Sequence, residues 1–509
     1  MGAEGKNMAI SDSAAPGKDA WKDALKSHPR ALLWCSYALL TCVMWGYDGL
    51  AGSIVLAIAQ FRKDYGQEFE GKFVIPAIWQ LAFGAGGLIG LVGGGAVTGV
   101  AAKKWGRQIC IMVAYVFSVV GVFLQWFSPG NLPLFFGGKV LTGLPLGVFV
   151  TIAPTYCAEI APAALRGAVT AGVNWSIVLG QCLAYVVMRQ TQSLPGPNAY
   201  RILFGVQWIF AAISLAILPF FVESPYHLVA QGKDDKARVN IRKLYGDNTN
   251  AEGMLASIKA DLDNANQTLR AASFRDCFRG TNTQRTLIAM STFVVQAVCG
   301  ISWIIGYMAY FLILGGMSDA RAFDATVGLS FIMLVGNMFG WVLIERFGRR
   351  GTALWGAVIL TLTLFMIGVM SILPVAGALW AQVAFMAVWS FTYQATIGSV
   401  AWPIITEVST SALRGHTQSL ATITNGLAGA VSGVLLPFAV NPDQGNMGGR
   451  IAFIYGGFLS LCCILIWMYY PETKGRSFAE IDRLFEMGVR PREFRTTVLL
   501  PAKDAKGAA

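Results

Sequence analysis

Asp48 is the residue of this chain whose type and surroundings point most directly to chemistry. It lies inside the long apolar stretch 31–58. A carboxylate in a membrane span costs at least ~2.5 kcal/mol, and ionisable residues in such places typically serve ion or proton transfer or substrate binding. Asp48 is therefore a candidate functional residue from its position alone.

Three charged patterns occur once in each half of the chain, in the same order. A Gly-Arg pair comes first, a Glu seven residues before an Arg-Gly follows, and a Glu next to a Pro or Ser-Pro comes last; the two copies are offset by 242, 248 and 249 residues. This near-constant offset indicates a duplicated membrane domain, from which many secondary transporters build a central site. The matching residues are Arg107 and Arg349, Glu159 and Glu407, Arg166 and Arg414, and Glu223 and Glu472.

The sequence lacks the patterns that are typical of enzymes. It contains no metal-ligand cluster, no Gly-rich phosphate loop and no nucleophile arrangement. The histidines lie outside the apolar stretches, at His28, His227 and His416. We therefore predict that the protein is not an enzyme and uses no cofactor or metal.

The elements that position these residues are apolar helices. Of 509 residues, 55% are hydrophobic and only 13% are charged, and the mean hydropathy is +0.54, whereas about 25% of residues are charged in a soluble protein. A membrane-spanning helix needs roughly 20 apolar residues. Twelve stretches meet this length, which predicts an all-α membrane protein: 31–58, 75–100, 109–127, 132–157, 168–188, 203–222, 286–314, 325–344, 352–373, 378–404, 417–440 and 451–470.

The twelve predicted transmembrane helices form two pseudo-symmetric halves of six. The expected division is a disordered N-terminus, the first half, a linker with short amphipathic helices, the second half and a tail, at 1–30, 31–222, 223–285, 286–470 and 471–509. The net charge of +11 is explained by Lys and Arg at the ends of the helices rather than by nucleic-acid binding. Their distribution predicts that both termini and the linker are cytoplasmic.

Combined motifs identify a family. The chain resembles the sugar porters of the major facilitator superfamily over nearly its whole length. The resemblance rests on Gly46-Tyr47-Asp48, Pro154-x-Tyr156-x-x-Glu159 with Arg166-Gly167, Asn174 with Gly180-Gln181, Glu345 to Arg350, Pro471 to Arg476, and Glu480-Ile481-Asp482. Within the family, the stretches 46–66 and 299–316 and the pair Trp79-Gln80 look most like fungal maltose and α-glucoside permeases.

The resemblance implies a role for Asp48. In proton-coupled members of the family the matching Asp takes up the proton beside an Arg on helix 4, and here the matching position is Lys139. We infer an Asp48–Lys139 pair in which protonation of Asp48 releases Lys139 and lets the halves rock. The alternatives are a static buried pair and a Lys139 that reaches the membrane surface.

The resemblance also implies a sugar site of hydrogen-bonding side chains and an aromatic platform. The retained positions are Gln181, Gln296, Asn337, Gly398, Asn425 and Trp402, with Trp402 as the platform. The chain departs from the family at Trp175, Ala297 and Ser302, where amides are usual. An added Trp175 suits a second sugar ring or a less polar ligand. Each of these side chains could instead serve ordinary helix packing.

Charged residues at the helix ends predict a cytoplasmic gate. Ion pairs among them would hold the halves together when the site faces outward and would break when it faces inward; the simpler alternative is that they only fix topology. Lys103 replaces the usual Asp and Tyr226 the usual Arg, so the first copy predicts a weaker gate. The gate residues are Arg107, Glu159, Arg166, Glu223, Glu345, Arg349, Glu407, Arg414 and Glu472.

Together these features predict a secondary active transporter that moves an α-glucoside, disaccharide or hexose by alternating access, with proton symport. The expected partners are a small sugar, a proton and the lipid bilayer, and the expected form is a monomer in the plasma membrane. The alternatives are a passive facilitator or exporter of a polyol or glycosylated metabolite, and a sugar sensor that does not transport. The short tail argues against the sensor.

Overall fold

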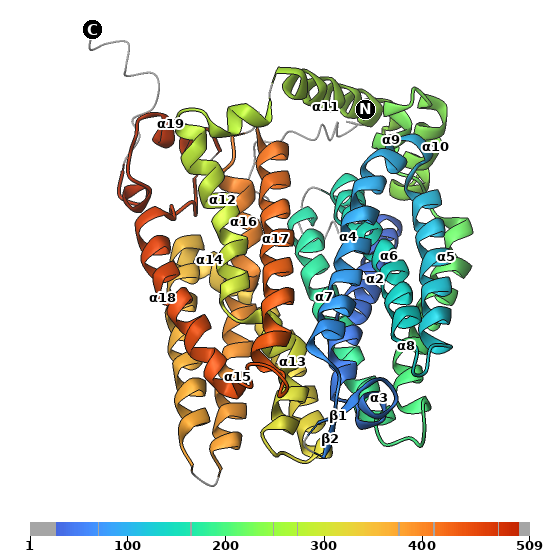
Figure 1. The fold of residues 1–509 in the computed structure, drawn as a ribbon. Helices are drawn as coiled ribbons and strands as arrows, with labels where there is room; N and C mark the ends of the chain where they lie inside the picture. The colour runs from blue at the N-terminus through green and yellow to red at the C-terminus, as the bar shows by residue number, and fades with distance from the viewer. Residues whose placement is uncertain are drawn as a thin grey trace, which may run out of the picture.

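The computed structural model describes residues 27–69, 71–162, 165–247, 249–271, 273–374, 377–410, 413–476 and 478–497. The described chain is a bundle of long helices with one small hairpin of two strands (Figure 1). Residues 1–26 of the predicted N-terminal segment and residues 498–509 of the predicted tail lie outside the described residues.

The first half of the chain forms helices long enough to cross a bilayer. Lengths of 20 to 29 residues give roughly 30–44 Å at 1.5 Å per residue, against a hydrocarbon core of about 30 Å. The elements are α2 (Pro29–Ile54), η1 (Val55–Ala57), α3 (Ala59–Tyr65), β1 (Gln67–Phe69), β2 (Lys72–Val74), α4 (Ala77–Trp105), α5 (Arg107–Trp126), α6 (Leu132–Ile160), α7 (Arg166–Thr191), α8 (Asn198–Ile217) and η2 (Leu218–Phe220).

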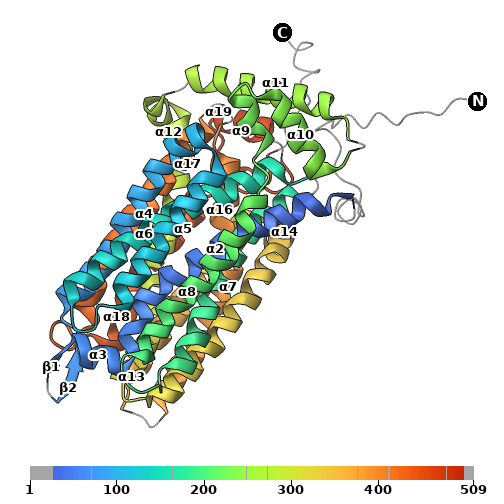
Figure 2. The same cartoon turned by 90° about the vertical axis from the view of Figure 1, so that its right-hand side faces the viewer.

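The second half repeats this arrangement after the linker. Its helices lie beside those of the first half, and both sets run in the same general direction (Figures 1 and 2). The elements are α12 (Thr281–Val298), α13 (Ile301–Leu314), α14 (Asp319–Ile372), α15 (Ala378–Ala395), α16 (Ile397–Val408), α17 (Arg414–Val440), η4 (Gly448–Arg450), α18 (Ile451–Tyr469), α19 (Phe478–Glu486) and η5 (Pro491–Glu493).

Short helices cover one end of the bundle. The linker contains α9 (Pro225–Ala230), α10 (Asp234–Tyr245), α11 (Ala251–Ala271) and η3 (Phe274–Phe278), and α19 lies at the same end (Figure 1). We call this end the linker side and the opposite end, with β1 and β2, the hairpin side. α10 is amphipathic because it buries Ala237, Ile241 and Leu244 at helical spacing.

Nine segments of the described residues are helical, long and apolar enough to cross a membrane. One of them, the 54-residue α14, contains two spans, because Gly348 has a φ of 81° and interrupts the helix. A positive φ of this kind favours glycine. α7, which contains more polar residues, and the pair α15–α16, divided at Thr396, complete the twelve predicted spans.

Glycines bring α2 and α7 into direct backbone contact. A Cβ on Gly46 would overlap the carbonyl of Ile177, and a Cβ on Gly180 would overlap the carbonyl of Val43. Such small residues allow helices in a membrane to approach closely. The contact fixes α7, with Gln181 next to Gly180, against the helix that carries Asp48.

Candidate substrate and proton-coupling site

Asp48 lies at the junction of three helices of the first half. Its Oδ1 accepts hydrogen bonds from Lys139 Nζ of α6 at 3.3 Å and from Gln207 Nε2 of α8 at 2.9 Å. The side chains of Asp48 and Lys139 are 1% and 7% exposed, and Gln207 is fully buried. Asp48 and Lys139 thus form a buried ion pair with an amide as third member.

The surroundings of the pair leave room for the Lys139 side chain. A Cβ on Gly52, one helical turn after Asp48, would lie 3.0 Å from Lys139 Nζ. The carbonyl of Lys139 accepts a hydrogen bond from Thr142 at 3.4 Å, and Thr142 accepts one from Gln125 at 3.2 Å. The ammonium is therefore positioned by its packing against α2 and by its bond to Asp48.

One carboxylate oxygen of Asp48 is available for a proton. Oδ2 is buried and has no hydrogen-bond partner among the described residues, while Oδ1 has two. A buried oxygen without a donor is costly, and protonation would make Asp48 neutral and weaken its attraction to Lys139. Chemically, this arrangement suits reversible proton binding.

Gln207 was not identified from the sequence as a site residue. The only signal was a glutamine in the apolar stretch 203–222, and an amide in a span does not show which neighbour it faces. Its contact with Asp48 depends on the rotation of α8, which the structure supplies.

Three of the predicted sugar-binding positions meet in the second half. Asn337 Nδ2 donates to Gln394 Oε1 at 3.3 Å, and a Cβ on Gly398 would lie 3.3 Å from the same oxygen. Gln296 Nε2 donates to the carbonyl of Ile397, next to Gly398, at 3.2 Å. Asn337 Oδ1 is buried without a partner among the described residues. Gln394 links these positions, although no pattern in the sequence marked it as a site residue.

None of the described hydrogen bonds links the other predicted sugar-binding residues to this cluster. On α7, Trp175 is half-buried, and Gln181 has a buried Oε1 that lacks a hydrogen-bond partner in the described part of the chain. Trp402 is 42% exposed and packs edge-on against Phe293, with ring centroids 5.2 Å apart. Asn425 on α17 is exposed. The structure therefore gathers one group of amides and leaves four predicted residues outside it.

Two stacked aromatic side chains lie on α15, the helix that also carries Gln394 of the amide cluster. Trp389 is fully buried and stacks on Tyr393, with ring planes 1° apart and centroids 5.1 Å apart. Trp389 Nε1 donates to the carbonyl of Cys299 at 3.1 Å. This contact holds α15 against the break between α12 and α13, so the cluster has a rigid wall on one side.

The first gate motif fastens the start of α5. Glu223 Oε2 accepts from the backbone nitrogens of Arg107 at 2.8 Å and Gln108 at 3.2 Å. A carboxylate at the positive end of a helix is stabilising. Arg107 Nη2 then donates to Glu159 Oε1 at 2.5 Å.

The second gate motif repeats this geometry with more contacts. Glu472 Oε1 accepts from the backbone nitrogen of Arg349 at 2.9 Å. The Arg349 guanidinium donates to both oxygens of Glu407, through Nη2 at 2.6 Å and Nε at 3.0 and 3.1 Å. Thr473 donates to Glu407 Oε2 at 2.5 Å. Each network joins helices of a single half.

The remaining gate residues are not paired in this way. Glu345 is exposed, and none of the described ion pairs includes it. Arg414 stacks on Phe478, with its guanidinium carbon 4.2 Å from the ring centroid, and its Nε and Nη2 are buried without hydrogen-bond partners among the described residues. The side chain of Arg166 lies outside the described part of the structure.

The two halves are joined by buried hydrogen bonds at the hairpin side. Asn441 Oδ1, at the end of α17, accepts from Gln80 Nε2 of α4 at 2.8 Å and from the Tyr310 hydroxyl of α13 at 2.9 Å. Asn441 Nδ2 donates to the carbonyl of Ile75 at 2.9 Å. Asn441 is fully buried and Gln80 is 4% exposed. We call these four residues the hairpin-side latch.

The chain is similar to known sugar transporters over most of its length. A family described as "Sugar (and other) transporter" matches residues 34–485. The chain is 31% identical over 504 residues to the MFS transporter fmqE of Aspergillus fumigatus, covering 96% of this chain and 93% of that protein. It is 30% identical over 498 residues to the general alpha-glucoside permease of Saccharomyces cerevisiae, covering 95% and 80%.

Solved structures share the fold. The inward-open xylose transporter XylE from E. coli has a TM-score of 0.74 at 22% identity, covering 89% of this chain and 99% of that chain. The proton:xylose symporter XylE bound to 6-bromo-6-deoxy-D-glucose has a TM-score of 0.70 at 23% identity, covering 90% and 99%. These likenesses confirm the predicted major facilitator fold.

Proposed function

Because this chain belongs to the sugar transporter family of the major facilitator superfamily, we propose that it carries a sugar across the membrane by alternating access, driven by proton symport. The substrate class is an α-glucoside, disaccharide or hexose, as the similarity to the alpha-glucoside permease suggests. The observation that carries the coupling proposal is the buried Asp48, which pairs with Lys139 and keeps one oxygen free.

Protonation of Asp48 removes the negative charge of the buried Asp48–Lys139 pair. Neutral Asp48 no longer attracts Lys139, so the contact between α2 and α6 weakens. Five residues after Asp48, Ser53 packs against Gly306 of α13 in the other half; a Cβ on Gly306 would lie 3.4 Å from that of Ser53. A shift of α2 is therefore transmitted directly to the second half.

The substrate is proposed to bind between the halves. Gln296, Asn337 and Gly398 contribute from the second half, with Gln394 as an added member, and Gln181 and Trp175 contribute from α7. Buried amide oxygens without partners on Asn337 and Gln181 support this proposal, because sugar hydroxyl groups can donate to them. Trp402 and Asn425 are proposed to contact the sugar when the halves move, with Trp402 as the aromatic platform.

The two halves, 31–222 and 286–470, are proposed to rock about this site as units. The hairpin-side latch supports a state closed on that side, while the described ion pairs on the linker side stay within each half. We propose that the linker and both termini are cytoplasmic, so this state faces inward. We further propose that the protein works as a monomer in the plasma membrane.

The test is a labelled uptake panel in a yeast strain that lacks sugar transporters. Glucose, maltose, xylose and inositol are compared with and without a protonophore, at equal surface expression. We expect one sugar to accumulate above its external concentration and the protonophore to abolish the accumulation. Uptake that only equilibrates would identify a passive facilitator, and accelerated loss of preloaded solute would identify an exporter; either result contradicts proton symport.

A further inference from the structure

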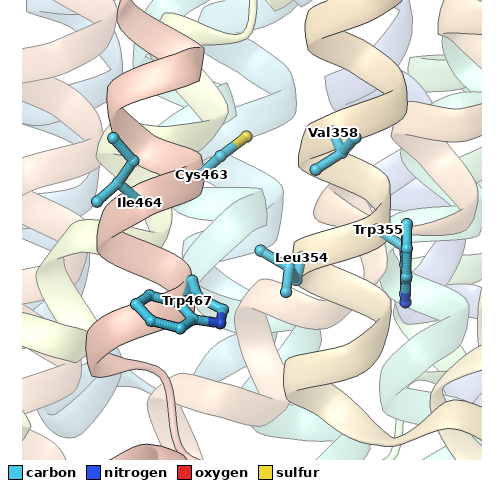
Figure 3. Close-up of a pocket in the computed structure, with 6 residues that line it drawn as sticks. All are labelled: Leu354, Trp355, Val358, Cys463, Ile464 and Trp467. Carbon is cyan, nitrogen blue, oxygen red and sulfur yellow. The ribbon is translucent and has the colours of Figure 1, made fainter.

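An apolar groove lies on the outer surface of the second half, and none of the proposed sugar-binding residues lines it. It is formed between the second span of α14 and α18, has a volume of about 400 Å³ and is open along one side (Figure 3). Its lining contains no charged residue and consists of Leu354, Trp355, Val358, Cys463, Ile464 and Trp467. Trp355 and Ile464 are 67% and 55% exposed, so the groove faces the lipid in a membrane.

Positive charge gathers where the groove reaches the linker side. Arg350 is one turn before Leu354, and its Nη2 donates to the carbonyl of Trp467 at 2.7 Å. The guanidinium carbon of Arg492 lies 5.9 Å from the ring centroid of Trp467. Lys474 Nζ donates to the carbonyl of Arg346 at 3.0 Å, and both of these side chains are exposed.

The acids at this end only partly balance the cations. Glu493 pairs with Arg492 at 3.6 Å, and Glu345 is exposed nearby in the sequence. Glu407 binds the Arg349 guanidinium, and Glu472 binds the backbone nitrogen of Arg349 and also attracts the Arg350 guanidinium. The mouth of the groove therefore presents a positive surface directly next to two tryptophans, which favour the membrane interface.

We propose that this groove binds an anionic phospholipid, with one acyl chain between α14 and α18 and the headgroup on Arg350 and Arg492. The apolar lining matches a hydrocarbon chain, and the cations at one end match a phosphate that carries an additional acidic group. The volume lies in the range of small-molecule sites, roughly 300–1,000 Å³. No step of the proposed sugar transport depends on this site.

A second copy of the chain fits this groove less well. A stable protein interface takes about 20–30 residues from each partner, whereas the groove has only six lining residues. A partner helix would also place its apolar surface beside Arg350 and Arg492 without satisfying their charge. A lipid provides both an acyl chain for the apolar lining and a negative charge for the two arginines.

The experiment uses the full chain in vesicles that contain a trace of phosphatidylserine with a photoreactive group on its acyl chain. After illumination, labelled peptides are mapped by mass spectrometry. We expect labelling at 354–358 and 463–467. Unlabelled phosphatidylserine should compete better than phosphatidylcholine with the same acyl chains, and inorganic phosphate should not compete.

Variants separate the two parts of the site. Arg350→Gln with Arg492→Gln should lower the preference for phosphatidylserine by roughly 30-fold, about fivefold per cation. The matched control Arg321→Gln, at the other end of α14, should not change it. Cys463→Phe should fill the groove and reduce labelling by both lipids, whereas Leu461→Phe, outside the lining, should not.

Three results would overturn the proposal. The first is equal competition by the two lipids; the second is labelling that is unchanged in both the charge variant and Cys463→Phe. The third is crosslinking of two protein copies through α14 or α18, which would assign the groove to a dimer. Because the charge and groove variants act on different residues, misfolding of one still leaves the other as a test.

Discussion

Replacing Asp48 by asparagine keeps the shape of the side chain and removes its charge. The Lys139 ammonium would then face a neutral amide in a site where its side chain is 7% exposed. Removing one partner of a buried ion pair costs roughly 3–5 kcal/mol, because the other charge stays buried without compensation. We expect a clearly lower thermal midpoint for Asp48→Asn in detergent, and recovery of most of the loss when Lys139→Met is added.

The same substitution should remove energy coupling. One proton that enters across 100 mV releases about 2.3 kcal/mol, and a tenfold ratio corresponds to 1.36 kcal/mol. A transporter with one proton per sugar can therefore reach an accumulation of roughly 50-fold at that potential. Without a group that binds the proton, Asp48→Asn should exchange labelled sugar across the membrane but accumulate it no further than about onefold.

The assay compares the wild-type chain, Asp48→Asn and a control in vesicles with an imposed potential. Gln125→Leu is the matched control, because it removes a buried amide that binds Thr142 beside Lys139 without touching Asp48. Accumulation near 50-fold in Asp48→Asn would refute the coupling role. A double variant with Lys139→Met that is no more stable than Asp48→Asn alone would refute the argument from the buried charge.

Three further predictions follow from other parts of the structure. Asn441→Leu should weaken the hairpin-side latch by about 2 kcal/mol and increase, roughly 30-fold, the labelling of a cysteine at Ser53 by a maleimide added from that side; unchanged labelling would reject the latch. Trp402→Ala should raise the half-saturation concentration for sugar at least tenfold, about 1.4 kcal/mol of lost stacking; an unchanged value at normal expression would reject the platform role. Glu407→Gln should lower the free energy of unfolding by about 1–3 kcal/mol and Glu159→Gln by less, measured by thermal unfolding. Equal losses would contradict the argument that Glu407 is held more strongly than Glu159.

Much of the fold could be predicted because the bilayer imposes it. Long apolar stretches must be helical in a membrane, so the spans were found from composition, with ends that differ by a few residues. The sequence predicted two separate spans at 325–344 and 352–373, and in the structure Gly348 divides α14 between them. The break at Thr396 between α15 and α16 had no sequence signal of comparable strength.

It was harder to predict which site residues contact one another than to predict which residues belong to the site. Asp48 was identified by its burial cost and Lys139 by the resemblance, and the structure places both in one ion pair. Gln207 and Gln394 were missed because an amide in an apolar helix does not reveal the direction in which it points. The latch between Gln80 and Asn441, 361 residues apart, depends on how the two halves dock, which no local pattern records.

The structure shows which contacts the repeated charged motifs make at the helix ends. In both copies, a glycine with positive φ ends one helix, a glutamate binds the backbone at the start of the next, and the following arginine reaches a second glutamate. The first copy holds Glu159 through one hydrogen bond, whereas the second holds Glu407 through three from Arg349 and one from Thr473.

From this difference we propose that the two halves contribute unequally to the transport cycle. Residues that fasten a helix end within one half make that half a more rigid body, because the bonds must break before the helix can tilt. The second half, which carries the amide cluster around Gln394, is the more tightly fastened. The first half carries Asp48, and its single Arg107–Glu159 bond opposes movement less. We propose that the second half, which is stiffer, binds the sugar and that the first half, which is more pliable, responds to the proton.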